Sequence, residues 1–414
     1  MGELSYIMSY ISMMRIPLAK LSTTERRTYV LDSTRGAVDG VLLSLEQSVF
    51  LLVAIQFFAV ADIYTSLITS SRFIGLFMTV FLPSLFGRRG WTKSFLVGTN
   101  TLLAGCFLIL SATDEVFFVP GIVLHLILIA VRTPLLTAIY EENYAKNRRG
   151  RLYSTGVMLS IICGLATGFI SANLLEKDIT LYRILFIFIG LLTIISGLLF
   201  LKVPSRKLRE NNHPLKDLKL LVRNKLFGLM SLSWSIVGFA NLWSLPLRVV
   251  HLADPERGLN FSPFLVILVL SIFPNLIRIL LNYYWAGHFD RHHFLRMRIT
   301  LNVFIAGGIL IFFLGKTLIA VSIGSIIMSI GFAGGAYLWN LWVMKIAPPG
   351  ETQHYMTAHT FLAGLRGMVS PFLGVFAAQI VNLQGIGIIS FGIMFAGSLV
   401  LLPSLKALKA LEKT

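Results

Sequence analysis

Residues 202–225, KVPSRKLRENNHPLKDLKLLVRNK, are the only long polar stretch between two extended apolar regions of the chain. A helix that crosses a hydrocarbon core of about 30 Å needs ~20 mostly apolar residues. Six such runs precede the polar stretch and six follow it, near residues 36–59, 63–85, 92–112, 116–140, 153–175, 181–201, 226–250, 262–286, 298–315, 317–344, 355–381 and 385–405. The sequence therefore predicts twelve transmembrane helices in two pseudo-symmetric bundles of six.

The composition supports an all-α integral membrane protein. Of the 414 residues, 56% are hydrophobic and 13% are charged, against about 25% charged in ordinary soluble proteins. The mean hydropathy is +0.78, which excludes disordered, collagen-like and coiled-coil chains because none of these carries so much apolar surface.

The polar stretch also sets the expected domain boundaries. We expect a cytoplasmic leader over residues 1–30, a first six-helix bundle over 31–201 and a cytoplasmic linker over 202–225. A second six-helix bundle is expected over 226–406 and a cytoplasmic tail over 407–414. The loops elsewhere are short, which leaves no room for a soluble domain or for the surface loops of a membrane enzyme.

The basic residues are distributed unequally between the two sides of the predicted membrane. The net charge is +17. Segments on the side of the N-terminus hold 26 of the 36 lysines and arginines, and the opposite segments hold four. The positive-inside rule then places both termini in the cytoplasm, in a cell membrane (inner or plasma membrane). The charge reflects topology in the lipid bilayer, so no nucleic-acid partner is expected.

Two short loops carry related motifs at matching places in the two predicted bundles. PSLFGRRG follows the second span at residues 83–90, and AGHFDRHHF follows the eighth at residues 286–294. Both resemble the G-x-x-x-D-R-x-G-R-R signature of the major facilitator superfamily, through Gly87, Arg88, Arg89, Asp290 and Arg291. The resemblance implies a monomeric secondary transporter that works by alternating access, with these two loops acting as conformational gates.

The short loops argue against an enzyme, and no motif in the chain implies a cofactor or a metal. The chain also lacks a Walker glycine loop, an H-E-x-x-H motif, a paired Cys motif and a G-x-S-x-G motif. The expected partners are a small-molecule solute and, as coupling ion, protons.

Two arginines lie at matching depths in the two bundles. Arg72 precedes Ser84 by twelve residues, and Arg278 precedes Asp290 by twelve. Twelve helical residues span about 18 Å, which reaches roughly the middle of the membrane. Guanidinium groups bind oxyanions bidentately, so we interpret the pair as a substrate site. The arrangement resembles that of anion carriers of the superfamily, including nitrate carriers.

Two acids in the first span are the candidates for proton coupling. Asp39 and Glu46 are seven residues apart, so they share a helix face about 10 Å apart along the axis. In the fourth span, Arg132 resembles an arginine that the superfamily links to proton movement. The alternative is structural, with the two acids permanently ionised as partners of Arg72 or Arg132.

His359 and Arg366 in the eleventh span show the same seven-residue spacing and are predicted to contact substrate in the same cavity. His359 can equally be a helix-contact residue. Because buried cations outnumber buried acids, the sequence favours a proton-coupled carrier of a small anionic or carboxylate-bearing solute. The alternative is a proton-driven efflux antiporter for multiple drugs or other amphipathic compounds.

Overall fold

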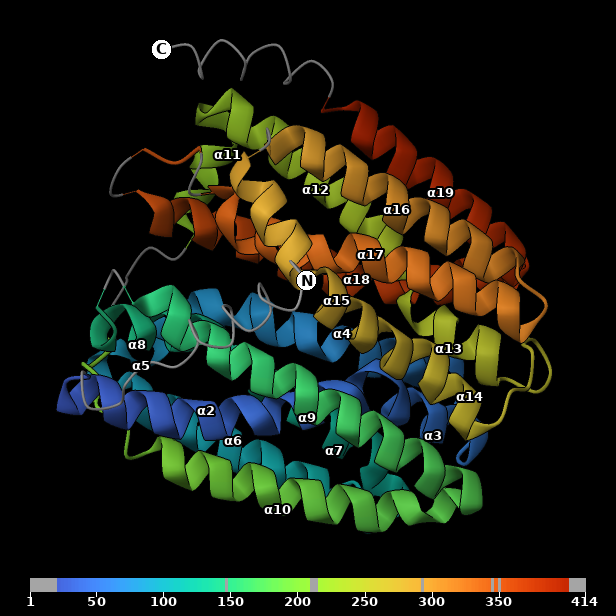
Figure 1. Cartoon of the computed structure of the whole chain (residues 1–414), viewed down its shortest axis with the longest axis horizontal. Helices are drawn as coiled ribbons and strands as arrows, with labels where there is room; N and C mark the ends of the chain where they lie inside the picture. The colour runs from blue at the N-terminus through green and yellow to red at the C-terminus, as the bar shows by residue number, and fades with distance from the viewer. Residues whose placement is uncertain are drawn as a thin grey trace, which may run out of the picture.

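The computed structural model describes residues 21–145, 148–208, 215–291, 294–343, 346–348 and 351–401. These residues form helices and no strand. The helices gather into an N-terminal half and a C-terminal half that lie side by side (Figure 1). The leader up to residue 20, the tail beyond residue 401 and residues 209–214 of the linker lie outside the described residues.

The N-terminal half contains six membrane-spanning segments, three of which are interrupted. In chain order they are α2 (Thr23–Ser44) with η2 (Leu45–Val49) and α3 (Phe50–Gln56); α4 (Asp62–Met78) with η3 (Thr79–Phe81) and α5 (Leu82–Phe86); α6 (Lys93–Leu110); α7 (Glu115–Val131) with α8 (Thr133–Asn143); α9 (Arg149–Lys177); and, after η5 (Ile179–Leu181), α10 (Tyr182–Phe200). The first segment begins at Thr23, well before residue 36, where we expected it.

The C-terminal half repeats this plan. Its segments are α12 (Lys225–Trp243) with α13 (Leu245–Ala253); α14 (Pro263–Ile267) with η7 (Leu268–Ile272) and α15 (Phe273–Arg291); α16 (Phe294–Leu314); α17 (Leu318–Leu341); α18 (Thr352–Ile380); and α19 (Leu383–Leu399). Among the described residues, eleven helices are long and apolar enough to cross a membrane, and α19 is a shorter apolar helix. The twelve-helix prediction is confirmed with α19 as the twelfth.

The two ends of the bundle differ. We call the end at which α10 stops and α12 starts the linker end, and the opposite end the far end. At the linker end the chain after α10 returns to the turn between α5 and α6: the amide of Leu208 donates to the carbonyl of Trp91 (2.9 Å), and that of Ser94 to the hydroxyl of Ser205 (2.8 Å). The described part of the linker then forms the short helices η6 (Lys216–Lys219) and α11 (Leu220–Arg223).

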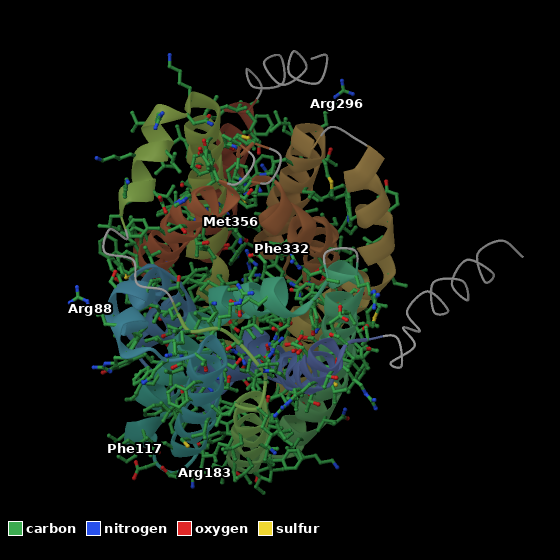
Figure 2. The ribbon with its side chains drawn as sticks, turned by 90° about the vertical axis from the view of Figure 1, so that its left-hand side faces the viewer. Arg88, Phe117, Arg183, Arg296, Phe332 and Met356 are labelled. Atoms are coloured by element: carbon green, nitrogen blue, oxygen red, sulfur yellow. The ribbon has the colours of Figure 1, made fainter. Side chains whose placement is uncertain are left out.

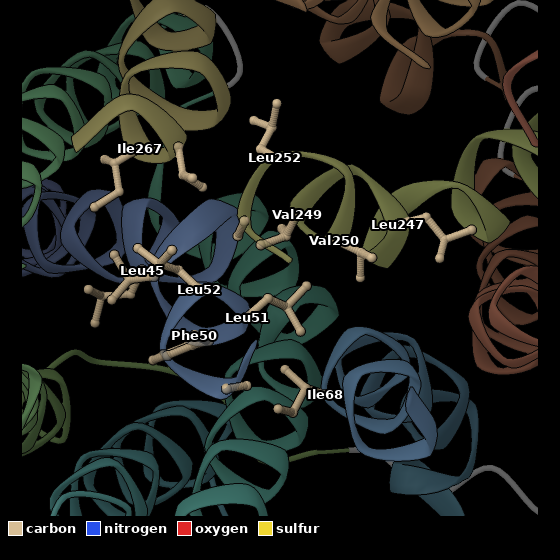
Figure 3. Packing of buried hydrophobic residues seen from close by; sticks show 14 of the residues in the cluster. Leu45, Phe50, Leu51, Leu52, Ile68, Leu247, Val249, Val250, Leu252 and Ile267 are labelled. Atoms are coloured by element: carbon tan, nitrogen blue, oxygen red, sulfur yellow. The ribbon is translucent and has the colours of Figure 1, made fainter. Parts of the chain in front are cut away.

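At the far end the two halves are in contact. Apolar side chains of η2 and α3 pack against those of α13 and α14, as Leu45, Leu51 and Val249 illustrate (Figure 3). The side-chain amide of Gln56 donates to two backbone carbonyls of the other half, at 2.8 and 3.1 Å. Arg257 also binds Asp62 of the other half through two hydrogen bonds of 2.7 Å. These contacts join the two halves at the far end.

Helix α2 approaches α9 closely because both carry small residues. A Cβ atom on Gly36 would lie 2.8 Å from the carbonyl oxygen of Gly156, and one on Gly40 would overlap the backbone of Ser160. Small residues let membrane helices pack at short range. The contact fixes the position of α2, which carries the acids of the site.

Candidate functional site

Two adjoining cavities lie between the halves. The larger, of about 500 Å³, is lined mainly by α2, α8 and α9, and we call it the linker-end compartment. The smaller, of about 260 Å³, is lined by both halves, and we call it the far-end compartment. They share Leu43, Glu46, Arg278 and Phe332. Phe332 lies where the two halves meet (Figure 2).

Each half contributes one π-helical turn to the interface. η2 follows Ser44, η7 contains Ser271, and the hydroxyl groups of these two serines lie 3.1 Å apart. Such turns occur frequently at functional sites. η2 contains Glu46, which lines both compartments. No pattern in the sequence predicts either π-helical turn.

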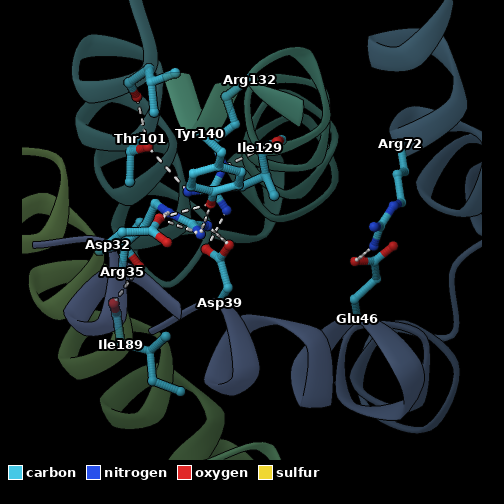
Figure 4. Close-up of polar contacts among 12 residues, drawn as sticks. Asp32, Arg35, Asp39, Glu46, Arg72, Thr101, Ile129, Arg132, Tyr140 and Ile189 are labelled. Atoms are coloured by element: carbon cyan, nitrogen blue, oxygen red, sulfur yellow. Dashed lines mark hydrogen bonds and ion pairs between the residues drawn. The ribbon is translucent and has the colours of Figure 1, made fainter. Parts of the chain in front are cut away.

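A charged cluster lines the linker-end compartment in the N-terminal half (Figure 4). Arg35 donates to Asp32 (2.8 Å) and to the Tyr140 hydroxyl (2.8 Å), which in turn donates to Asp32 (2.8 Å). Arg35 and Arg132 both form ion pairs with Asp39. Two carboxylates thus face two guanidinium groups, and the cluster is balanced in charge.

Sequence reasoning missed Asp32, Arg35 and Tyr140 as members of this cluster. Placing the start of the first span at residue 36 left Asp32 outside the membrane and made Asp39 and Glu46 the only interior acids. Asp32 is in fact 3% exposed and lies inside α2. The capping box that starts this helix, Ser22 with Glu25, was the available signal.

The predicted coupling residues do not form one group. Asp39 and Arg132 belong to the balanced cluster, and Arg132 is placed there by the break between α7 and α8, just before Pro134. Glu46 instead pairs with Arg72 (2.6 Å), and their side chains are 22% and 41% exposed. Figure 4 shows this pair apart from the cluster.

The structure brings Arg72 and Arg278 to the same cavity, as their matched depths indicated. Arg72 lines the linker-end compartment and Arg278 lines both compartments, so the two side chains share the linker-end compartment. Among the described side chains, no acid lies within ion-pair distance of Arg278. Arg72, Arg278 and Glu46 together leave one positive charge in excess.

His359 and Arg366 do not line either cavity. Both lie on the side of α18 that faces α12. His359 packs edge-on against Trp234 and Trp342, with ring centres 5.4 and 5.2 Å away. Arg366 donates to the backbone carbonyl of Trp234. The expectation that they share the cavity of Arg72 is therefore not met, and their contact with substrate stays a prediction.

The first signature loop forms a compact turn at the linker end. Gly87, Arg88 and Arg89 make a short 3₁₀ helix, closed by Gly90 in the left-handed conformation (φ 68°). The guanidinium of Arg89 lies over the Trp91 ring, 5.1 Å from its centre. For the second loop the structure gives only the backbone at the end of α15, so the side chains of Asp290 and Arg291 lie outside the described residues. The gate role of both loops stays a prediction.

Within the described ranges, no group of three or more His, Cys, Asp or Glu side chains could hold a metal ion. The chemistry that the cavity offers is ionic. Arginines and carboxylates in a partly dry space can bind an anion and can hold or release a proton.

Comparison with known proteins identifies the fold. The family model described as Major Facilitator Superfamily matches residues 40–371. No curated protein matches the chain.

Solved transporter structures share the architecture at low sequence identity. The nucleoside transporter NupG is 13% identical, with a TM-score of 0.66 over 92% of this chain and 100% of that one. A D-xylose-proton symporter is 14% identical, with a TM-score of 0.66 over 90% and 98%. A POT family transporter in complex with 5-aminolevulinic acid is 13% identical, with a TM-score of 0.70 over 90% and 94%. These likenesses concern the fold alone.

Proposed function

Since the chain belongs to the major facilitator superfamily, it is a membrane transporter and not an enzyme, and we propose that it carries a small anionic or carboxylate-bearing solute together with protons. The two halves rock about the central cavity and expose it alternately to either side of the membrane. The substrate binds between Arg72 and Arg278.

The excess positive charge of the cavity carries this proposal. Arg278 lines both compartments, and among the described residues no acid forms an ion pair with it. An unpaired charge in a membrane-buried helix costs about 2.5 to 3.5 kcal/mol on insertion scales unless it faces a cavity or a partner. A bound oxyanion supplies that partner, and the guanidinium of Arg72 can reach it from the other half.

Glu46 supplies a route for proton coupling. In this structure its carboxylate accepts a hydrogen bond from the guanidinium of Arg72, so the two side chains form an ion pair. Protonation of Glu46 weakens the ion pair and frees Arg72 for the substrate, so each bound species favours the binding of the other. This linkage corresponds to symport of an anion with a proton. Asp39 is the second candidate carrier, but it is held by two arginines rather than one.

Binding of shape-matched probes tests the proposal. Benzenesulfonate is an anion that does not titrate near neutral pH, and phenyltrimethylammonium is a cation of similar size. A ligand that binds the folded state raises its stability, by about 2.7 kcal/mol at a hundredfold excess over Kd. We expect benzenesulfonate to raise the melting temperature and to drive counterflow in proteoliposomes. Stabilisation by the cation alone would contradict the proposal.

That contrary result would favour the second candidate, a proton-driven efflux antiporter for amphipathic compounds. One observation supports this alternative. Apolar side chains dominate the lining of the far-end compartment, and such a lining suits amphipathic molecules.

We further propose that the protein is a monomer in a cell membrane. Its linker end and both termini face the cytoplasm. The partition of 26 basic residues against four supports this orientation. Leu215 in the linker is 45% exposed, so a cysteine at this position in a cysteine-free variant reports the topology. We expect an impermeant thiol reagent to label it only after the cells are opened, and labelling of intact cells would reverse the orientation.

A further inference from the structure

We infer that the transported anion is amphipathic, with its charged head held by Arg248 as well as by Arg72 and Arg278, and with its apolar body in the far-end compartment. This inference rests on the proposed function, which requires only an anion. It adds a second binding residue in the C-terminal half and the chemical class of the rest of the molecule.

Arg248 is held in place but is not neutralised. It lies in α13, just after the break at Ser244, and is 6% exposed. One terminal nitrogen donates to the side-chain oxygen of Asn241 (2.6 Å) and to the hydroxyl of Ser244 (3.1 Å). Its guanidinium carbon lies 5.8 Å from the centre of the Phe332 ring. These contacts orient the guanidinium without cancelling its charge.

One donor of this guanidinium is unused. Among the described residues, Nε of Arg248 is buried without a hydrogen-bond partner, and no acid lies within ion-pair distance. Burial of an uncompensated donor and charge is costly. Because Arg248 and Arg278 line the same compartment, an oxyanion placed between them would satisfy both.

The rest of the compartment is apolar and belongs to both halves. Its walls include Leu51, Ile68 and Leu126 from the N-terminal half and Val249 and Met328 from the C-terminal half. Figure 3 shows Leu51, Ile68 and Val249 gathered in one region. A bare inorganic anion would leave these side chains against water, whereas an apolar body would cover them.

The size of the compartment limits that body. Pockets for drug-sized ligands measure roughly 300 to 1,000 Å³, and this compartment measures about 260 Å³. A single ring or a short alkyl chain is therefore the expected body.

A homologous series of alkanesulfonates tests the inference on the unmodified protein. Methane- to hexanesulfonate compete with labelled benzenesulfonate for counterflow in proteoliposomes. Each methylene that enters the compartment should strengthen competition up to about fourfold, until the space is filled. Equal competition by the shortest and longest members would overturn the amphipathic substrate and leave the anion proposal intact. Failure of every anion, benzenesulfonate included, to bind or exchange would contradict both.

Variants of Arg248 test the second binding residue. Arg248→Gln should weaken competition by every sulfonate about tenfold while the gain per methylene is kept, since the head loses a partner and the body does not. Arg248→Lys keeps the charge, and it replaces Arg248→Gln in this test if that variant does not fold. It should bind several-fold more weakly, because it lacks the planar fork. Arg296→Gln, an exposed arginine of the same half, is the matched control. Wild-type affinities in a folded Arg248 variant would remove the residue from the site.

Discussion

The interior arginines of the two halves differ in whether they have an acid as ion-pair partner, although both halves repeat the same six-helix plan. In the N-terminal half, Arg35, Arg72 and Arg132 each form an ion pair with an acid of α2 or η2. In the C-terminal half, Arg248 and Arg278 have no acid within ion-pair distance among the described residues. The interior arginines of the N-terminal half are therefore balanced by acids, whereas Arg248 and Arg278 leave the C-terminal half of the cavity with excess positive charge.

This difference suggests a division of labour. Paired carboxylates and guanidinium groups can exchange partners when a proton arrives, so the N-terminal half is equipped for coupling. Unpaired guanidinium groups at a cavity attract an anion, so the C-terminal half is equipped for binding. Arg72 belongs to the first group by its pair with Glu46 and to the second by the compartment that it shares with Arg278.

The largest effect is expected where the balanced cluster is broken. Asp39→Asn removes a carboxylate that two arginines share and leaves buried charge uncompensated. We expect a loss of stability of about 3 kcal/mol, the lower end of the range for a buried pair, because the Asp39 side chain is 25% exposed. Melting temperature and expression of the purified variant measure this. Glu141→Gln, at an exposed acid of α8, should behave like wild type, and wild-type stability of Asp39→Asn would show that the cluster is not structural.

A loss of transport without a loss of folding is expected in the other half. Arg278→Ala should lower the rate of benzenesulfonate counterflow about ten- to hundredfold, since a hydrogen bond to a charged group contributes about 1.5 to 3 kcal/mol. Arg278→Lys should restore little, because it lacks the bidentate fork. Arg72→Ala, in the N-terminal half, should lose transport similarly, because Arg72 lines the cavity with Arg278. Undiminished counterflow by both alanine variants would place the substrate elsewhere.

A smaller effect is expected at the contact that joins the halves at the far end. Arg257→Gln removes both hydrogen bonds to Asp62. Exposed ion pairs contribute about 0.2 to 1 kcal/mol, so the population open at the far end should rise at most about fivefold. Spin labels at Ile63 and Glu256, on the two sides of the contact, report this distance distribution. An unchanged distribution would exclude the ion pair as a lock.

The smallest effect is expected from acid at the same contact. Burial alone would raise the pKa of Asp254, but hydrogen bonds from the amides of Arg257 and Glu256 and from the Arg257 guanidinium lower it overall. A carboxylate with a lowered pKa stabilises this folded turn, which positions Arg257 for its contact with Asp62. The stabilisation is present above the unfolded pKa of about 3.9 and is lost as the pH falls through the folded value. The same spin labels should therefore show no change between pH 7 and 5 and loosening only below about pH 4. Loosening at pH 6 would assign the effect to another group.

Much of the fold could be predicted from the sequence, because apolar runs of membrane length and the asymmetry of basic loops are strong local signals. The matched depths of Arg72 and Arg278 were also readable, since equal spacing from a repeated loop fixes equal height on a helix. This spacing indicated that Arg72 and Arg278 reach the same part of the molecule, and both line the linker-end compartment.

The direction in which side chains point was not readable in the same way. His359 and Arg366 share one face of α18, yet α12 packs against that face and both side chains contact Trp234. The π-helical turn at Glu46 also rotates the rest of the first span, and no residue pattern encodes it. Partner choice among several arginines and acids depends on these rotations, which only the packed structure reveals.

The pH dependence of benzenesulfonate binding, compared between wild type and Glu46→Gln, tests most directly that Glu46 and the substrate compete for Arg72. The sulfonate does not titrate, so any dependence belongs to the protein. We predict that wild-type affinity rises as the pH falls, because protonation frees Arg72, and that the Glu46→Gln variant binds with high affinity at every pH, because a neutral amide resembles the protonated acid. A wild type without pH dependence, or a variant that keeps the wild-type dependence, would contradict this account.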